Sequence, residues 1–285
     1  MIKALPCFVA LHNPSSLIIN RIEAGQSSLC FEVKHDDKSY FVKYNDNLSF
    51  FENELKTSKA ASHIALSPRV IYAANDWLVN EFVYGETLDR SGASMPDKIG
   101  IALDLMKQCH SLKVTLPLLN ITKIITRIVN NSCFSNVQKD HIQALLCKLP
   151  TPFGNNYVVC HSDINFSNII MANSRAWLID FECACLAEKE FEIAMFFAIN
   201  LLTADEQSYA LKVYQALNPN EGINIKSLNT YLLYSYLLNG LWYIEKVEET
   251  MNESKIINFR TLAAKQFHLF DLIWPSEMPL KSIMR

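Results

Sequence analysis

The chain has 285 residues, of which 50% are hydrophobic and 19% are charged. This length supplies a large core and suggests one large domain or two modest ones. A net charge of −3 argues against nucleic acid as the main partner, because that function needs a basic face. The longest apolar stretches, residues 193–202 and 231–244, are shorter than the roughly 20 residues that a membrane span needs.

The eight cysteines are spread along the chain and form no Cys-x-x-Cys pair. Cys183 and Cys185 are close together, but no histidine follows at zinc-finger spacing, so the pattern predicts no zinc site. The first residues lack a cleavage site, so no signal peptide is predicted. We therefore expect a cytoplasmic protein with reduced thiols in its core and no membrane partner.

The first 83 residues alternate in short strand-like runs that are separated by polar turns. Residues 50–62 instead have the apolar spacing of a helix, and Pro68 separates this helix from the next strand-like run. The expected strands are residues 17–22, 29–34, 39–44, 69–73 and 77–83. The second and third of these strands should form a hairpin around a polar turn at residues 35–38.

After Gly85 the pattern becomes mostly helical. Helices are expected over residues 97–112, 121–130 and 140–148, and again over most of the chain from residue 191. Short strand-like runs interrupt them at residues 157–160, 169–171 and 177–179. A β-rich front and a helix-rich back predict an α+β fold with two lobes and a cleft between them. We expect the lobes to be residues 1–83 and 84–285.

Two polar clusters follow apolar strand-like runs in the second half of the chain. The first is His161-Ser162-Asp163-Ile164-Asn165-Phe166-Ser167-Asn168, and the second begins at Asp180. Phosphoryl transfer needs a carboxylate near the attacking hydroxyl and oxygen ligands for magnesium, roles that suit Asp163 and the pair Asn168 and Asp180. Any one of these residues alone would be explained as a turn cap. Their order and spacing together indicate a kinase.

Lys43 lies in an alternating strand, where an exposed lysine needs no special explanation. A kinase, however, needs a lysine on such a strand to hold the nucleotide phosphates, oriented by a carboxylate from the following helix. Two residues of that helix, Glu52 and Glu54, are candidates for this carboxylate, and Glu54 is the preferred one.

The small-residue turn before this hairpin contains Gly25, Ser27 and Ser28. Its backbone N–H groups and serine hydroxyls would suit phosphate binding. A plain hairpin turn explains the same residues equally well, and only the position ahead of Lys43 favours phosphate.

These motifs resemble those of the aminoglycoside phosphotransferase and choline kinase superfamily, which shares the protein-kinase-like fold. Within it the chain is most similar to the bacterial thiamine kinases, from about Leu17 to the C-terminal helices. The firmest points are His161–Asn168 and the tetrapeptide Ile179-Asp180-Phe181-Glu182. The resemblance implies a two-lobed enzyme with an antiparallel sheet in its N-terminal lobe, which uses ATP and Mg²⁺ to phosphorylate a small-molecule alcohol.

Carried over to this chain, the resemblance makes Asp163 the catalytic base, within a catalytic motif that includes His161. Asn168 and Asp180 would be the magnesium ligands, and Lys43 would bind phosphates. Glu182 and the aromatic residue Trp242 would lie near the acceptor. Adenine would bind to the link between the lobes, which consists of Asn80, Glu81, Phe82 and Val83.

Three residues depart from the family pattern. Ser162 stands where the family usually has glycine, Cys183 replaces a common aromatic residue, and Glu192 replaces an aspartate that is typical of that helix start. None of these changes removes a catalytic group. They bear on the identity of the acceptor more than on the activity.

An acidic segment follows the second cluster, and it suits a cationic acceptor. Its acids are Asp180, Glu182, Glu188, Glu190 and Glu192. Thiamine, choline and ethanolamine each carry an alcohol beside a positive nitrogen, and aromatic faces such as Trp242 would attract them. Acids at a helix N-terminus and aromatic residues in a core are an equal explanation. A thiamine-like acceptor is preferred, and choline, ethanolamine or an aminoglycoside is the alternative.

Two other classes of protein stay open. A nucleotide-binding pseudokinase would be favoured by loss of the catalytic residues, yet Lys43, Asp163 and Asn168 are all present. A protein kinase would have a long activation segment, whereas the residues after Asp180 lead directly into a helix. A small-molecule kinase is the preferred prediction, and the sequence does not indicate its oligomeric state.

Overall fold

The structure is a computed structural model that describes residues 1–10, 16–22, 28–45, 48–74, 76–152, 154, 156–275 and 279–280. The chain forms two compact units. The first unit contains residues 1–116 and 159–185, and the second contains residues 117–158 and 186–285. The lobe boundary that we expect between residues 83 and 84 stays a prediction.

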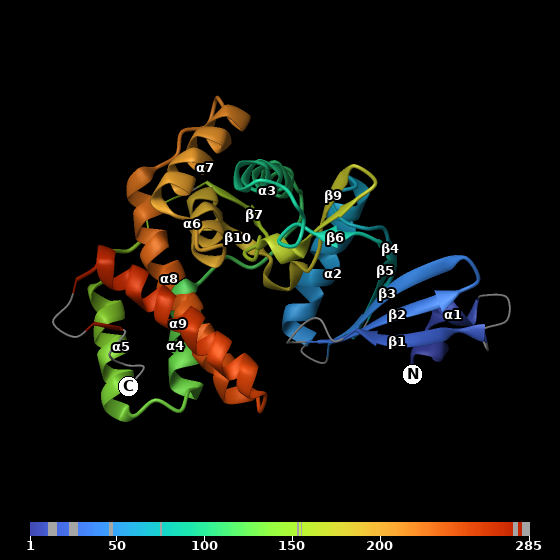
Figure 1. Cartoon of the computed structure of the whole chain (residues 1–285), viewed down its shortest axis with the longest axis horizontal. Helices are drawn as coiled ribbons and strands as arrows, with labels where there is room; N and C mark the ends of the chain where they lie inside the picture. Colours follow the sequence, from blue (N-terminus) through green and yellow to red (C-terminus); the bar gives the residue numbers. More distant parts are fainter. Residues whose placement is uncertain are drawn as a thin grey trace. The chain divides into compact units, whose positions relative to one another are not determined.

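A five-stranded antiparallel sheet forms the centre of the first unit, with the strand order β1-β2-β3-β5-β4 (Figure 1). Its strands are β1 (Ile18–Ile22), β2 (Leu29–His35), β3 (Lys38–Tyr44), β4 (Val70–Ala74) and β5 (Trp77–Glu81). The predicted strands therefore exist, with ends that differ by no more than two residues. The sheet and the mostly helical remainder confirm the predicted α+β class.

Side chains along β3 alternate between two faces of this sheet, as the period of two in a strand requires. Tyr40 and Val42 lie on an apolar face, where the register pairs them with Val33 and Phe31 of β2. Phe41 and Lys43 lie on the opposite face. The second face therefore carries Lys43, the predicted phosphate-binding residue.

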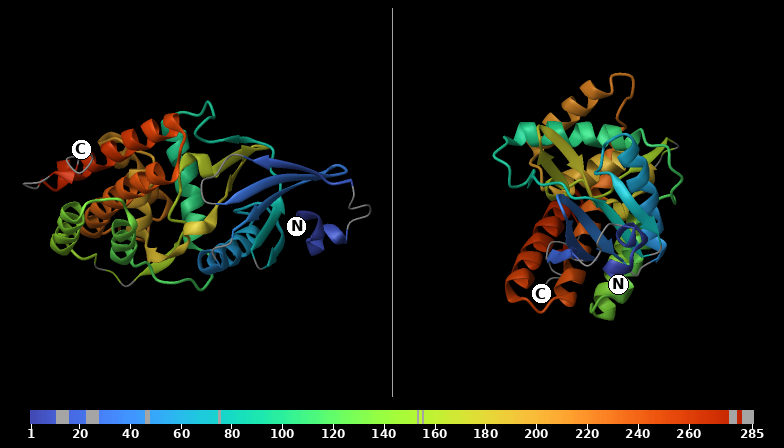
Figure 2. Two further views of the ribbon diagram at one scale, coloured as in Figure 1. Left: turned by 90° about the horizontal axis from the view of Figure 1, so that it is seen from below. Right: turned by 90° about the vertical axis from the view of Figure 1, so that its right-hand side faces the viewer.

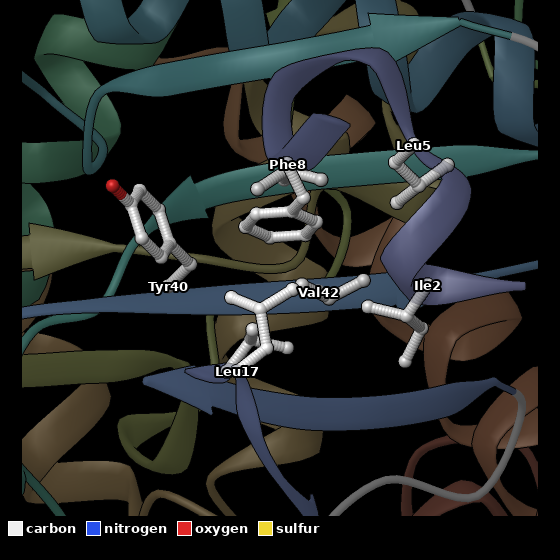
Figure 3. Packing of buried hydrophobic residues seen from close by; sticks show 8 residues of the cluster. Ile2, Leu5, Phe8, Leu17, Tyr40 and Val42 are labelled. Atoms are coloured by element: carbon white, nitrogen blue, oxygen red, sulfur yellow. The ribbon is translucent and has the colours of Figure 1, made fainter. Parts of the chain in front are cut away.

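The N-terminal segment covers the apolar face of the sheet, and no element was predicted there. It forms η1 (Ile2–Ala4) and α1 (Pro6–Val9). Phe8 is fully buried, and its ring lies 5.4 Å from that of Tyr40 in an edge-to-face arrangement. Figure 3 shows Phe8 and Leu5 beside Tyr40 and Val42. The buried cluster consists of Ile2, Leu5, Phe8, Leu17, Val33, Tyr40, Val42 and Val79.

Helix α2 (Leu48–His63) follows the sheet's third strand and packs against η4 (Phe181–Cys183). Its buried positions include Phe51, Glu54, Ser58 and Ala61, which recur at the spacing of one helical face. Glu54 is therefore carried inward on an otherwise small or apolar face. The backbone N–H of Leu178 donates to the carbonyl of Leu66, just beyond the helix, at 3.0 Å.

A second sheet of the first unit has the strand order β6-β8-β9, and its strand β8 follows the loop of residues 161–168. Its strands are β6 (Glu86–Thr87), β8 (Ile169–Ala172) and β9 (Arg175–Leu178). Gly85 precedes β6, and a Cβ atom there would lie 2.3 Å from the carbonyl oxygen of Met171. Only glycine permits this close approach of two backbones. The unit also contains α3 (Met95–His110), which begins with Ser94 as its N-cap.

The second unit is mostly helical (Figures 1 and 2). Within it, α8 packs against α4, α6 and α9. Its helices are α4 (Ile121–Asn131), α5 (Asn136–Lys148), α6 (Lys189–Ile199), α7 (Ala204–Leu217), α8 (Ile225–Glu249) and α9 (Glu253–Ile273). Strands β7 (Tyr157–Cys160) and β10 (Cys185–Glu188) each join one unit to the other along the chain. Among the described residues, none of the helices is long and apolar enough to cross a membrane.

Candidate active site

His161 is fully buried at the start of the candidate catalytic loop, residues 161–168. Its Nε2 lies 2.9 Å from the carbonyl oxygen of Ile179, and its Nδ1 accepts from the backbone N–H of Asp163 at 3.2 Å. This pattern fixes the tautomer with the proton on Nε2, since a carbonyl only accepts. His161 therefore holds the loop against the segment that leads to Asp180.

Asp163 is held by two side-chain amides. The Nδ2 of Asn165 donates to its Oδ1 at 2.9 Å, and the Nδ2 of Asn168 donates to its Oδ2 at 2.8 Å. Burial raises the pKa of Asp163 to about 7, while these two hydrogen bonds oppose the rise. A carboxylate that is fixed in direction and has a pKa near neutrality is suited to accept a proton from an alcohol.

The backbone turns sharply at both ends of this site. Ser162 has φ 68° and Asp180 has φ 69°, values in the left-handed region that favours glycine. Ser162 is the residue that replaces the family's usual glycine, and its hydroxyl lies 3.3 Å from the Sγ of Cys185. Strained backbone of this kind is typical of functional loops, where the surrounding structure holds it in place.

Lys43 lies at the centre of an ionic cluster on the polar face of the sheet. Its Nζ donates to Glu54 Oε1 at 2.8 Å, to Asp180 Oδ1 at 2.7 Å and to Glu182 Oε2 at 3.0 Å. Lys43 and Glu54 are both buried. The three carboxylates raise the pKa of Lys43 well above its ordinary value, although burial alone would lower it. The lysine is therefore charged, and all three of its donors are engaged.

The structure places Glu54, and not Glu52, against Lys43. Glu52 is exposed and pairs with Lys56, four residues on, at 2.7 Å. Burial raises the pKa of Glu54 to about 7, and Lys43 opposes this rise. Strand β2 contributes Cys30, which the register pairs with Lys43, and burial raises the pKa of its thiol to about 11. A thiol with so high a pKa is protonated and unreactive at neutral pH.

Polar atoms near Lys43, on the polar face of the first sheet, fit a nucleotide. Among the described residues, the buried Ser28 Oγ and Asn80 Oδ1 have no hydrogen-bond partner. The backbone N–H groups of Glu81 and Phe82 donate to the carbonyls of Arg69 and Ser39. For Val83, in contrast, no hydrogen bond of the N–H group is found within the described part of the chain. Buried polar groups are normally paired, so these atoms suit a ligand that carries its own donors and acceptors.

The donor set also fits a magnesium ion. Asn168 uses its Nδ2 on Asp163, which leaves its Oδ1 without a partner among the described residues. Asp180 uses Oδ1 on Lys43, and its Oδ2 is likewise unpaired there. Carboxylate and amide oxygens are the ligands that this hard cation takes in proteins.

The remaining predicted site residues have different outcomes. Gly25 and Ser27 fall outside the described residues. Glu182, predicted to lie near the acceptor, contacts the phosphate-binding candidate Lys43. Trp242 belongs to α8 of the second unit, where it is 37% exposed and Lys246 Nζ lies 5.5 Å from its ring centroid. Its role towards an acceptor stays a prediction.

Three acids of the predicted acidic segment lie at the start of α6 in the second unit. Glu188, Glu190 and Glu192 are all buried. Glu190 Oε1 accepts from the backbone N–H of Asn224 at 2.8 Å. Tyr234 and Tyr236 are buried among the helices of the same unit. This arrangement matches the alternative explanation, in which these acids and aromatic rings support the helical packing.

One functional side chain that the sequence did not single out for chemistry is Asn165. Its Oδ1 accepts from the backbone N–H groups of Ser167 and Asn168, while its Nδ2 donates to Asp163. The N-cap position explains the first two bonds from sequence alone. The third bond depends on how the loop folds back, which spacing does not reveal.

Comparison with known proteins identifies the family. The family model described as choline/ethanolamine kinase matches residues 19–275. This match covers most of the chain, which therefore belongs to the choline/ethanolamine kinase family. Members of the family are small-molecule kinases with a hydroxyl acceptor, so the predicted enzyme class is confirmed. A search of curated proteins by sequence found no match.

Solved structures share the fold at low sequence identity. An ethanolamine kinase from Plasmodium vivax is 19% identical, with a TM-score of 0.68 over 92% of this chain and 86% of that one. Choline kinase from Streptococcus pneumoniae is 17% identical, with a TM-score of 0.66 over 87% and 92%. Spectinomycin phosphotransferase, solved with ADP and spectinomycin, is 15% identical, with a TM-score of 0.59 over 94% and 92%. These likenesses show the predicted protein-kinase-like fold, and the family match confirms the predicted superfamily. Its thiamine kinase branch is not supported.

Proposed function

We propose that this member of the family transfers the γ-phosphoryl group of ATP to the hydroxyl of choline or ethanolamine, with magnesium as the cofactor. One observation carries this proposal. Lys43 joins Glu54 to Asp180 at one position, and Asn168 fixes the carboxylate of Asp163 at another. Phosphoryl transfer needs these parts: a lysine for phosphates, oxygen ligands for a cation, and an oriented carboxylate for the attacking hydroxyl.

Asp163 accepts the proton of the acceptor hydroxyl as the new bond to phosphorus forms. The amides of Asn165 and Asn168 hold its two oxygens, so the carboxylate keeps its direction without reorganising. Lys43 must release one carboxylate before it can donate to a phosphate, because its three donors are engaged. Glu54 is the partner that it keeps, since both residues are buried on one side of the cluster.

Magnesium would be held by Asn168 and Asp180, and when bound it supplies positive charge that offsets the charge developing on the phosphates. Residues 1–83 contain the proposed nucleotide contacts Lys43, Ser28 and the backbone of Val83. Residues 84–285 contain the catalytic and metal-binding residues. The spectinomycin phosphotransferase of the same fold was solved with ADP, which supports a nucleotide at this site.

The acceptor assignment rests on the family and on the chemistry of the alcohol. The family match and two structural neighbours, an ethanolamine kinase and a choline kinase, favour choline or ethanolamine over the thiamine-like acceptor that the sequence resemblance favoured. Both alcohols are cationic, and a cation near an aromatic face gains about 0.5–2 kcal/mol. Trp242, in the second unit, remains the aromatic residue that the sequence predicts for such a cation, and within that unit its ring lies 5.5 Å from Lys246 Nζ.

A coupled assay of ADP release tests this function. Purified protein with Mg-ATP is supplied in turn with choline, ethanolamine, thiamine and kanamycin, and product phosphorylation is checked by mass spectrometry. We expect turnover on choline or ethanolamine, and its loss when EDTA removes magnesium. Turnover on thiamine or kanamycin alone would contradict the acceptor assignment. ATP binding without turnover on any alcohol would instead indicate a pseudokinase.

A further inference from the structure

Asn80 lies on the polar face of the first sheet, near the end of β5. The register pairs it with Phe41 of β3, and pairs Leu78 with Lys43. Its side chain therefore projects from the same face as the phosphate-binding candidate Lys43, one two-residue step along the sheet from the Lys43–Leu78 pair. The next segment, Glu81–Val83, is where the proposed function places the adenine base.

The side-chain amide of Asn80 has no hydrogen-bond partner within the described part of the chain. Its Oδ1 is buried, and no hydrogen bond of this side chain is found among the described residues. Other asparagines of the unit are engaged: Asn165 and Asn168 both donate to Asp163. A buried amide oxygen without a partner carries a desolvation penalty that a bound ligand would remove. No hydrogen bond fixes the orientation of the amide either, so both of its polar atoms are available.

We infer that Asn80 reads the edge of the adenine ring that carries N6 and N7. A carboxamide presents one acceptor and one donor side by side, and this pair matches the N6 amino group and the N7 acceptor of adenine in a bidentate contact. Guanine has acceptors at both O6 and N7, so one of its atoms would face Oδ1 without a proton between them. Asn80 is thus the residue that selects ATP over GTP. This inference rests on the proposed nucleotide site, and it adds a side-chain contact to the backbone contact at Val83.

The test pairs an atomic change in the ligand with a change in the side chain. The ligands are ATP and 7-deaza-ATP, which has a C–H group in place of N7, and the variants are Asn80→Leu and Asn80→Asp. Dissociation constants are measured by calorimetry and KM values by ADP release. We expect the wild type to bind 7-deaza-ATP about tenfold more weakly than ATP, because one bond of the bidentate pair is lost. Asn80→Leu should bind both nucleotides equally, since it has no donor for N7.

Asn80→Asp should reverse the preference between ATP and 7-deaza-ATP, a result that a purely structural role of Asn80 would not produce. Its carboxylate accepts from N6 but repels the lone pair of N7, so 7-deaza-ATP should bind better than ATP. The preference for ATP over GTP should be about tenfold or more smaller in Asn80→Leu than in the wild type. An unchanged ratio of ATP to 7-deaza-ATP affinity across the three proteins would overturn the inference and leave the kinase intact. No ATP binding by the wild type would overturn the proposed function as well, and if Asn80→Leu does not fold, Asn80→Asp alone decides.

Discussion

Neighbouring residues of strand β3 point to opposite faces of the sheet, and the two faces differ in polarity and in what their side chains contact. On one face Tyr40 and Val42 are buried under the N-terminal segment in an apolar cluster. On the other face Lys43 holds three carboxylates. The first face is covered by apolar side chains of the chain itself. Near the second face, Ser28 and Asn80 have buried polar atoms that find no hydrogen-bond partner among the described residues. The apolar face contributes buried contacts to the sheet, whereas the polar face is the proposed nucleotide-binding face.

The largest expected effect belongs to the polar region. Asp163→Asn removes the proposed base, and we expect kcat to fall by roughly 10²–10⁴ with little change in ATP affinity. The physical reason is that a neutral amide cannot take the proton of the acceptor hydroxyl. The measurement is steady-state ADP release together with calorimetry of ATP binding. Asp104→Asn, an exposed change on α3, is the matched control and should keep wild-type turnover. Wild-type kcat in Asp163→Asn would contradict the assignment of the base.

The apolar face should affect stability instead of catalysis. Phe8 is fully buried against Tyr40, so Phe8→Ala should lower the free energy of unfolding by about 3–5 kcal/mol, through lost transfer energy and the cavity left behind. Urea unfolding measures this change, and kcat should stay unchanged at temperatures where the variant is folded. The neighbouring Val9 is 59% exposed, and Val9→Ala should change stability by less than about 0.5 kcal/mol. Equal effects of the two variants would show that the N-terminal segment does not stabilise the sheet.

A third prediction compares two glutamates of α2. Glu54→Gln keeps a hydrogen-bond acceptor for Lys43 but removes a buried charge, so Lys43 is held less firmly and the KM for ATP should rise about tenfold. Glu52→Gln removes only an exposed pair with Lys56 and should leave KM within about twofold. Kinetics at saturating acceptor measure both. A larger effect from Glu52 than from Glu54 would refute the phosphate-orienting role of Glu54.

The pH dependence of kcat tests whether ionised Asp163 acts as the base. Burial raises the pKa of Asp163 to about 7, so the base is ionised above this pH and protonated below it. We expect kcat to fall about tenfold between pH 8 and pH 6. The free energy of unfolding should change in the opposite direction. Between the ordinary pKa of Asp163 in the unfolded chain and its raised pKa in the folded protein, the folded state binds more protons than the unfolded state. Asp163 therefore lowers the free energy of unfolding as the pH rises through this range. A flat kcat profile, in a variant series where Asp163→Asn is inactive, would show that a step other than proton transfer limits turnover.

Much of this site could be predicted from the sequence because its parts are close in sequence or follow a period. The spacing from Asp163 to Asn168 and the Asp180 motif predicted a kinase, and the family match confirmed that class. The choice of Glu54 was also within reach, because Phe51, Glu54, Ser58 and Ala61 share one helical face. The role of the first ten residues was not, because a short apolar run reveals nothing of the surface that it will cover. The pairing of Glu182 with Lys43 joins residues 139 apart in the chain, and local pattern cannot supply such a contact.

The smallest expected effect concerns the backbone that presents Asp163. Ser162 has φ 68°, a backbone conformation that costs a non-glycine residue about 1–2 kcal/mol. Glycine would remove this cost, but part of the stabilisation would be lost because a glycine gives the unfolded chain more conformational freedom. We therefore expect Ser162→Gly to raise the free energy of unfolding by about 0.5–1 kcal/mol, as measured by urea unfolding. Asn173→Gly, at φ 51° in the turn between β8 and β9, is a control for the same backbone effect away from the catalytic loop. If Asn173→Gly stabilises the protein and Ser162→Gly does not, the contact of the Ser162 hydroxyl with Cys185 must offset the strain. That outcome would give this serine a stabilising role of its own in a position where the family usually has glycine.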